Sequence, residues 1–259
     1  MNAKSLAART LAPLFAALLA GSAFAADVHV ISSGGFAAAY KDLLPGFESS
    51  SPHKVKSAYG ASQGGASDSI SSRLGRGEPA DVLIMAAPAL DNLIKAGKAL
   101  PGSRVDLARS TIAMAVRAGA PKPDIGTVDA FKRAMLEAKS IAFSASASGT
   151  YLQTELFPKL GLMEQIKDKL KRIESERVGT VVARGDAELG FQQLSELIPI
   201  AGIDIVGPLP EAIQQVTIFS AGIAVGSKEP EAAKALINYL SSPAAAPIIS
   251  KTGLEPIKK

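Results

Sequence analysis

Serine and glycine gather in three turns of the chain, each between a strand-like segment and a helix-like segment. The turns are residues 32–35 (SSGG), 60–65 (GASQGG) and 144–151 (SASASGTY). Backbone N–H groups at the start of a helix lack partners within the helix and lie at the positive end of its dipole, so they can bind an anion. Serine hydroxyls add donors, and glycine lets a ligand approach the backbone. Serine is also an ordinary N-cap, so one such turn would indicate little, but three of them predict an anion-binding site.

The candidate binding residues come from these turns, with one arginine and one glutamine from elsewhere in the chain. They are Ser32, Ser33, Gly34, Ser62, Gln63, Arg109, Ser146, Ser148, Gly149, Thr150 and Gln192. A guanidinium pairs with a carboxylate through two parallel hydrogen bonds, and Arg109 lies near an expected crossing between two halves of the protein. For most other arginines, including Arg73 and Arg76, a solvated surface is the simpler interpretation.

The sequence excludes several kinds of site. It contains no cysteine and only two histidines, His29 and His53. Disulfides and thiol catalysis are therefore impossible, and the two histidines do not have the spacing of metal ligands. A Ser-His-Asp triad is not expected either. We expect no metal ion and no organic cofactor.

The start of the chain resembles a targeting segment. Residues 1–25 carry Lys4 and Arg9, an apolar run at 11–19 and the tripeptide Ala-Phe-Ala at 23–25, a pattern typical of a secretory signal peptide cleaved after Ala25. Cleavage would also remove two positive charges from a formal net charge of only +4, which argues against nucleic acid as a partner. We expect an exported protein in the bacterial periplasm, a compartment compatible with the absence of cysteine.

Strand-like and helix-like segments alternate along the chain, which predicts βαβ units. Residues 28–31 are rich in β-branched side chains, and the apolar residues that follow Gly35 recur at helical spacing. Similar pairs follow at 81–85 with 87–96, and at 140–143 with a helix reaching residue 160. We therefore expect an α/β fold with largely parallel sheets and helices on both faces, and a ligand bound beyond the carboxyl ends of the strands.

The order of these segments predicts two lobes with the ligand cleft between them. After the signal peptide at 1–25, we expect the first lobe to comprise residues 26–107 and 217–259, and the second lobe residues 108–216. The strand-like segment at 217–225 should return the chain to the first lobe. The two crossings between lobes are expected near residues 106–111 and 216–220.

The ordered motifs resemble the periplasmic molybdate-binding proteins, which are receptors of ABC importers with the two-lobed type II periplasmic-binding-protein fold. The likeness covers essentially all of the chain after residue 25. It rests on Ser32-Ser33, Ser62 before a helix, residues 77–82 (GEPADV) before a strand, residues 148–151 (SGTY) before a helix, and residues 183–191 (ARGDAELGF). In that family the turns and later segments donate hydrogen bonds to a tetrahedral oxyanion.

Two departures from the family's pattern indicate a different ligand. The family has a tyrosine after its Gly-Phe pair, whereas this chain has Gln192 and Gln193, and the second turn is several residues longer, through residues 64–69. A carboxamide offers acceptors as well as donors, whereas a fully ionised oxyanion needs donors only. With Ser-Ser-Gly-Gly-Phe early and Gly-Phe-Gln-Gln late, the chain is similar to a branch that includes periplasmic aconitate isomerases.

Two functions follow as hypotheses. The first is isomerisation of cis- and trans-aconitate, in which a base removes a proton from a CH2 group and a proton returns at the other end of the allylic system. The base must be a carboxylate, a lysine, a tyrosinate or a relayed water. Asp68 and Tyr151 are the candidates, although Asp68 could simply cap a helix and Tyr151 could pack beneath its turn.

The second hypothesis is a receptor that delivers molybdate, tungstate or an organic anion to an ABC importer. We favour the isomerase, and we expect a monomer whose ligand is an organic anion with carboxylates, a tricarboxylate, over a compact oxyanion.

Overall fold

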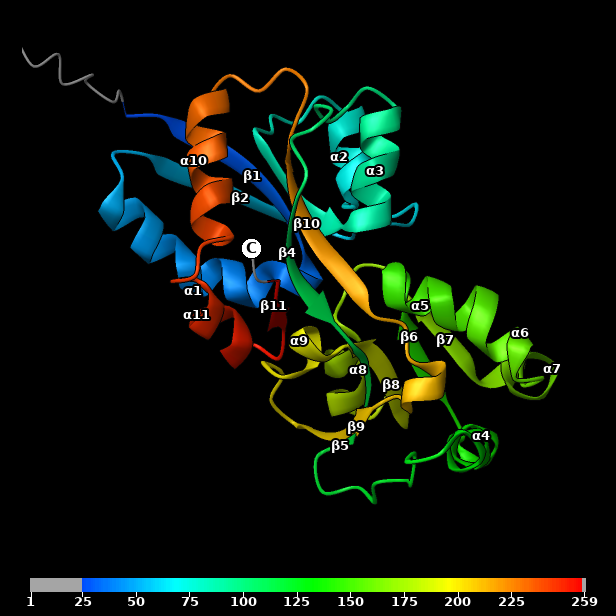
Figure 1. Cartoon of the computed structure of the whole chain (residues 1–259). Helices are drawn as coiled ribbons and strands as arrows, with labels where there is room; N and C mark the ends of the chain where they lie inside the picture. The colour runs from blue at the N-terminus through cyan, green and yellow to red at the C-terminus, as the bar shows by residue number, and fades with distance from the viewer. Residues whose placement is uncertain (1–24, 258–259) are drawn as a thin grey trace, which may run out of the picture.

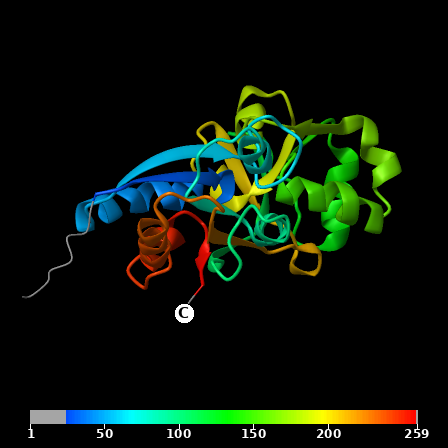
Figure 2. The same ribbon diagram turned by 90° about the horizontal axis from the view of Figure 1, so that it is seen from above.

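The structure is a computed structural model that describes residues 25–257, so the expected signal peptide lies outside the described residues except for Ala25. Two β-sheets form the centres of two lobes (Figure 1). Figure 1 shows the blue and red ends of the chain in the upper lobe and the green and yellow middle in the lower one, and in Figure 2, seen from above, the cyan and yellow segments of the two lobes overlap. The two-lobed α/β fold expected from the sequence is therefore confirmed.

The first sheet contains six strands in the order β11-β4-β10-β3-β1-β2. They are β1 (Asp27–Ser33), β2 (Lys54–Gly60), β3 (Val82–Ala86), β4 (Val105–Ser110), β10 (Thr217–Ile223) and β11 (Glu255–Pro256). The helices of this lobe are α1 (Gly34–Ser50), α2 (Ile70–Gly75), α3 (Ala87–Lys95), α10 (Pro230–Leu240) and α11 (Ala246–Lys251).

The second sheet contains five strands in the order β7-β6-β8-β5-β9. They are β5 (Ile112–Arg117), β6 (Ile141–Ser144), β7 (Leu170–Ile173), β8 (Leu189–Gln193) and β9 (Ile203–Pro208). The helical elements of this part of the chain are α4 (Val128–Glu137), α5 (Ala147–Tyr151), the π-helix η1 (Leu152–Leu156), α6 (Phe157–Lys159), α7 (Met163–Ile166), the 3-10 helix η2 (Lys167–Lys169), α8 (Val178–Arg184), α9 (Leu194–Leu197) and the 3-10 helix η3 (Glu211–Ile213).

Helices cover both faces of the first sheet, because its central strands bury side chains on both faces. In β1, Val28 and Val30 pack into the core formed with α1 and α10, whereas Ile31 packs into the core formed with α2 and α3. Strand β3 is buried throughout, and its side chains alternate between the same two cores: Ile84 packs into the first and Met85 into the second. This two-sided burial explains why β3 is continuously apolar.

The expectation of largely parallel sheets is wrong, because both sheets are mixed. Strand β1 is parallel to β2 and β3, but β10 is antiparallel to both β3 and β4. In the second sheet, β6 is parallel to β7 and β8, whereas β5 is antiparallel to β8 and β9. The chain changes direction because it enters β5 and β10 from the other lobe and not through a crossover helix.

Two short crossings join the lobes, and the Gln214 side chain connects one crossing to the other by hydrogen bonds. The first crossing is Thr111, between the end of β4 and the start of β5. Gln214, just before β10, accepts a hydrogen bond from the Ile112 N–H and donates one to the Ile112 carbonyl, each at 2.9 Å. The lobe boundaries stay a prediction, but β4 pairs with β10 as far as Ser110, so a boundary before Ala108 would cut through this strand.

Asp81 joins the first strand to the start of α10. Its side chain is buried and accepts hydrogen bonds from the His29 N–H at 2.8 Å, the Ser227 hydroxyl at 2.7 Å, and the Lys228 and Glu229 N–H groups. Burial alone would raise the pKa of Asp81, but these hydrogen bonds favour the carboxylate and lower its pKa below the ordinary value. Asp81 therefore stabilises the fold above the ordinary carboxyl pKa, and this contribution is lost as the pH falls through the lowered value.

We expect Asp81→Ala to lower the free energy of unfolding at pH 7 by about 3 kcal/mol, because four donors lose a buried, charged acceptor. Urea titration followed by circular dichroism measures the change. Asp27→Ala is the matched control, since its carboxylate is half exposed and its one ion pair within residues 25–257 is with Lys56, and its loss should stay below about 1 kcal/mol. Equal stability of the two variants would contradict the structural role of Asp81.

Candidate functional site

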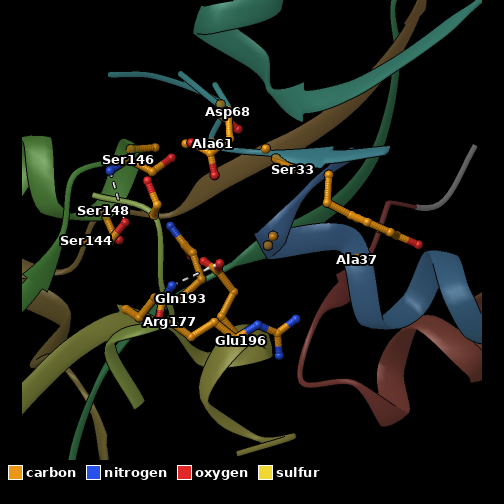
Figure 3. Close-up of a pocket in the computed structure, with 18 of the residues that line it drawn as sticks. Ser33, Ala37, Ala61, Asp68, Ser144, Ser146, Ser148, Arg177, Gln193 and Glu196 are labelled. Carbon is orange, nitrogen blue, oxygen red and sulfur yellow. Dashed lines mark hydrogen bonds between the residues drawn. The ribbon is translucent and has the colours of Figure 1, made fainter. Parts of the chain in front are cut away.

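A cavity of about 290 Å³ opens between the two lobes, where the serine-glycine turns come together (Figure 3). Its lining includes hydroxyls, two cations, four acids and two amides. These are Ser33, Ser62, Ser144, Ser146, Ser148, Ser175, Lys41, Arg177, Asp68, Glu174, Glu176, Glu196, Gln192 and Gln193. A cavity of this size is near the lower end of those that hold small molecules.

The first two turns lie together because β1 and β2 are parallel and end at the same edge. In their register Ser33 stands beside Gly60. The second turn then folds back, so that the Asp68 carbonyl occupies the space that a side chain at Gly60 would need. Within this turn the Ser62 hydroxyl accepts a hydrogen bond from the Ala86 N–H at 3.0 Å, which attaches the turn to the end of β3.

Several hydroxyls on the cavity are free to bind a ligand. Ser33 is the N-cap of α1 but makes no capping hydrogen bond, and its buried hydroxyl has no partner among the described residues. Ser146 is the N-cap of α5 and its side chain likewise makes no capping bond. The Ser148 side chain, from the first turn of α5, is also buried at the cavity. A buried hydroxyl without a partner is costly, so a ligand oxygen that accepts from Ser33 would be favoured.

The charged groups of the cavity differ in their partners. Glu176 accepts hydrogen bonds from Arg184 at 2.8 and 3.1 Å, and Glu174 lies 3.4 Å from Arg172, so both acids pair outside the cavity. No ion pair of Asp68 or Glu196 is present within residues 25–257. The Asp68 Oδ1 atom is buried and has no hydrogen-bond partner in the same part of the chain. Asp68 and Glu196 are therefore the two acids available to a ligand.

Glu196 stands in α9, at the point where the second lobe meets the start of α1. Its Oε1 atom accepts a hydrogen bond from the Gln192 amide at 3.0 Å, and the Gln192 carbonyl oxygen in turn accepts from the Val178 N–H at 2.9 Å. A side chain at Gly34 would overlap the Glu196 carboxylate. Burial raises the pKa of Glu196 to about 7, although Arg177 and the hydrogen bond from Gln192 oppose the increase.

Ser195, the residue before Glu196, adds a hydrogen bond between the lobes. The buried Ser195 hydroxyl donates to the Gly35 carbonyl at 2.7 Å, from α9 of the second lobe to α1 of the first. The cavity is therefore closed on this side by direct contact between the lobes.

The structure brings together about half of the residues expected from the sequence. Those that line the cavity are Ser33, Gly34, Ser62, Asp68, Ser146, Ser148 and Gln192. Gln63, Thr150 and Tyr151 line a neighbouring cavity of about 410 Å³ instead, and the Tyr151 hydroxyl donates to the Ile213 carbonyl at 3.0 Å.

Three further expected residues lie away from the cavity lining. The Ser32 hydroxyl is buried and donates to the Ser33 carbonyl at 3.2 Å. Gly149 is buried against the Ser144 carbonyl, which leaves no space for a side chain. Arg109 is half exposed and lies 3.5 Å from Glu255, because β11 pairs with β4 at this position. The roles expected for these residues stay predictions.

Sequence reasoning missed Lys41, Arg177 and Glu196. Lys41 follows Ser33 by two turns of α1, and its ammonium lies 4.7 Å from the centre of the Tyr59 ring. Arg177 is the residue before α8 and directly follows residues 174–176 (ESE). Glu196 follows Gln192 by four residues, and this spacing is the one sequence feature that could have indicated their contact. Among residues 25–257 no cluster of acidic or histidine side chains could hold a metal ion, and no helix there is long and apolar enough to cross a membrane.

Comparison with known proteins identifies relatives along nearly the whole chain. The chain is 48% identical to an aconitate isomerase from Pseudomonas sp. over 228 residues, which cover 88% of this chain and 87% of that protein. It is 32% identical to the molybdate-binding protein ModA from Azotobacter vinelandii over 255 residues, which cover 95% and 96% of the two chains. The resemblance expected from the motifs is therefore confirmed.

The solved structure of the Azotobacter vinelandii periplasmic molybdate-binding protein has the same fold, with a TM-score of 0.68 at 22% identity over 88% of this chain and 98% of that one. The profile of the bacterial extracellular solute-binding proteins matches residues 28–255. This match spans both lobes and every turn that lines the cavity. The chain therefore belongs to the bacterial extracellular solute-binding protein family.

Proposed function

We propose that this protein is a periplasmic aconitate isomerase, which interconverts cis- and trans-aconitate on a solute-binding-protein scaffold. The observation that carries the proposal is the 48% identity to an aconitate isomerase over nearly the full length of both chains. The family's description as extracellular, together with the expected signal peptide, supports export to the periplasm. Because a fold alone does not determine function, the cavity must also suit the reaction.

The donors of the cavity suit an anion with several carboxylates. Ser33 and Ser148 offer hydroxyls on opposite sides of the cavity, and Lys41 and Arg177 add two positive charges. Hydrogen bonds from such groups to an ionised carboxylate are shorter and stronger than those between neutral groups. Donors spread around the cavity can hold separate carboxylates, which a compact oxyanion does not require. We therefore propose a tricarboxylate as the ligand.

The proposed reaction needs a base and a means of stabilising negative charge. Removal of a proton from the CH2 group of one aconitate isomer leaves an allylic carbanion, whose charge spreads into the adjacent carboxylates. Return of a proton at the other end of the allylic system forms the double bond in its new position, so that protons and electrons balance. Hydroxyl and N–H donors already directed at those carboxylates lower the energy of the carbanion.

The second candidate is a receptor for molybdate or another small anion, acting with an ABC importer. The 32% identity to a molybdate-binding protein over nearly all of both chains favours it. Two features of the cavity count against it. Asp68 and Glu196 place carboxyl groups on the cavity, and Gln192 adds a carboxamide. An ionised carboxylate repels an oxyanion and contributes nothing to its binding, whereas an isomerase requires a base.

The activity itself is the first test. Purified protein that begins at Ala26, incubated with trans-aconitate, should form cis-aconitate at a rate proportional to protein concentration, and chromatography of the two isomers measures the rate. Calorimetric titration with molybdate is the companion measurement. Tight molybdate binding without any conversion or binding of aconitate would contradict the isomerase and leave the receptor.

The hydroxyl donors are tested by removing them one at a time. Ser33→Ala and Ser148→Ala should each weaken binding of tricarballylate roughly tenfold or more, because a hydrogen bond to a charged group contributes about 1.5 to 3 kcal/mol. Tricarballylate is a saturated tricarboxylate that cannot isomerise, so calorimetry measures its binding alone.

Ser49→Ala is the matched control for these two variants, since the exposed Ser49 hydroxyl donates to the Gly46 carbonyl near the end of α1. Its affinity for tricarballylate should equal that of the unmodified protein. If Ser33→Ala and Ser148→Ala also bound tricarballylate with this affinity, the ligand would not contact these serines.

A further inference from the structure

We infer that Glu196 is the catalytic base, which takes the proton from the CH2 group of bound aconitate and returns a proton to the other end of the allylic system. This inference rests on the proposed isomerase activity and assigns its proton transfer to one residue. Sequence reasoning had pointed to Asp68 or Tyr151. The position, contacts and surroundings of Glu196 favour it over both.

Glu196 and Tyr151 line different cavities. Glu196 lines the same cavity as Ser33 and Ser148, whereas Tyr151 lines the neighbouring one and donates its hydroxyl proton to the Ile213 carbonyl. Figure 3 shows Glu196 on the opposite side of the cavity from Asp68, near Arg177 and Gln193. A ligand held by the serine turns therefore lies between the two acids.

Contacts fix one carboxylate oxygen of Glu196 and leave the other available. Gln192 donates to Oε1 at 3.0 Å, and the Gln192 carbonyl oxygen accepts a hydrogen bond from the Val178 N–H. These two hydrogen bonds fix the orientation of the Glu196 carboxylate. No hydrogen bond to Oε2 is present within the described part of the chain. The space at Gly34 lets the carboxylate approach the start of α1 without a side chain between them. A base held in this way is aligned before the substrate arrives.

The surroundings give Glu196 a proton affinity suited to both halves of the reaction. Burial raises its pKa to about 7, so near neutral pH it can act as a base and, once protonated, as an acid. The charged groups on the same cavity are Arg177 before α8, Lys41 of α1, Asp68 after β2, and Glu174 and Glu176 after β7. Arg177 is the one that acts directly against the increase.

Glu196→Gln tests the assignment, because it removes the base while keeping the size of the side chain and a hydrogen bond from Gln192. We expect its turnover of trans-aconitate to fall by about 10² to 10⁴-fold. Its dissociation constant for tricarballylate should stay within a few fold of the unmodified protein, which shows an intact site. Solvent deuterium should enter aconitate recovered from the unmodified enzyme in D2O, and this exchange should be lost with turnover in the variant.

Two further variants make the result specific. Glu231→Gln, an exposed acid in the first turn of α10, is the matched control and should keep full turnover. Asp68→Asn is the competing variant. Loss of turnover and exchange in Asp68→Asn, with both retained in Glu196→Gln, would overturn the assignment while leaving the isomerase in place. Absence of turnover in the unmodified protein would instead contradict the proposed function.

The pH dependence provides a readout independent of activity. Because the pKa of Glu196 is raised in the fold, its contribution to stability is present below the ordinary carboxyl pKa and is lost as the pH rises through about 7. Glu196→Gln should therefore have a higher Tm relative to the unmodified protein at pH 8 than at pH 5. A Tm difference that is the same at both pH values would contradict the environment on which the assignment depends.

Discussion

Parallel strands that end side by side are the constraint on which the rest of this structure depends. Because β1 and β2 run in the same direction and in register, Ser33 and Gly60 stand beside each other, and their turns open toward the same space. The third turn reaches that space from the other sheet, since β6 ends at Ser144. Strand pairing therefore gathers the first two donor-rich turns, and the contact between the lobes brings in the third, although residues 66–143 separate it from the second.

The cavity combines two electrostatic environments with opposite effects on a carboxylate. Its serine turns and its two cations favour negative charge, whereas the surroundings of Glu196 disfavour it enough to raise the pKa of that residue to about 7. The difference arises from hydration. The Glu196 carboxylate loses the stabilisation that water gives its charge, and the hydrogen bond from the neutral Gln192 amide replaces only part of it. A binding scaffold can acquire proton chemistry in this way without any change in its fold.

Much of the architecture could be predicted because local patterns carry it. The serine turns, the returning strand β10 and the two lobes follow from periodicity and chain order. Strand direction could not be predicted, because the antiparallel placement of β5 depends on the crossing at Thr111 and that of β10 on the crossing just before Thr217. Arg109 was expected at the cleft, but pairing of β11 with β4 holds it near Glu255, a long-range effect. Glu196 was missed since its contact with the start of α1 at Gly34 exists only when one lobe rests on the other.

The bond from Ser195 to the Gly35 carbonyl has a thermodynamic consequence for how the cavity opens. Separation of α9 from α1 would break this bond and hydrate the Glu196 carboxylate, which lowers its affinity for a proton. Proton uptake and lobe closure are therefore linked, so each must favour the other by the same free energy. Acidification of the medium would then favour the form in which α9 contacts α1, because that form holds the proton on Glu196 more tightly.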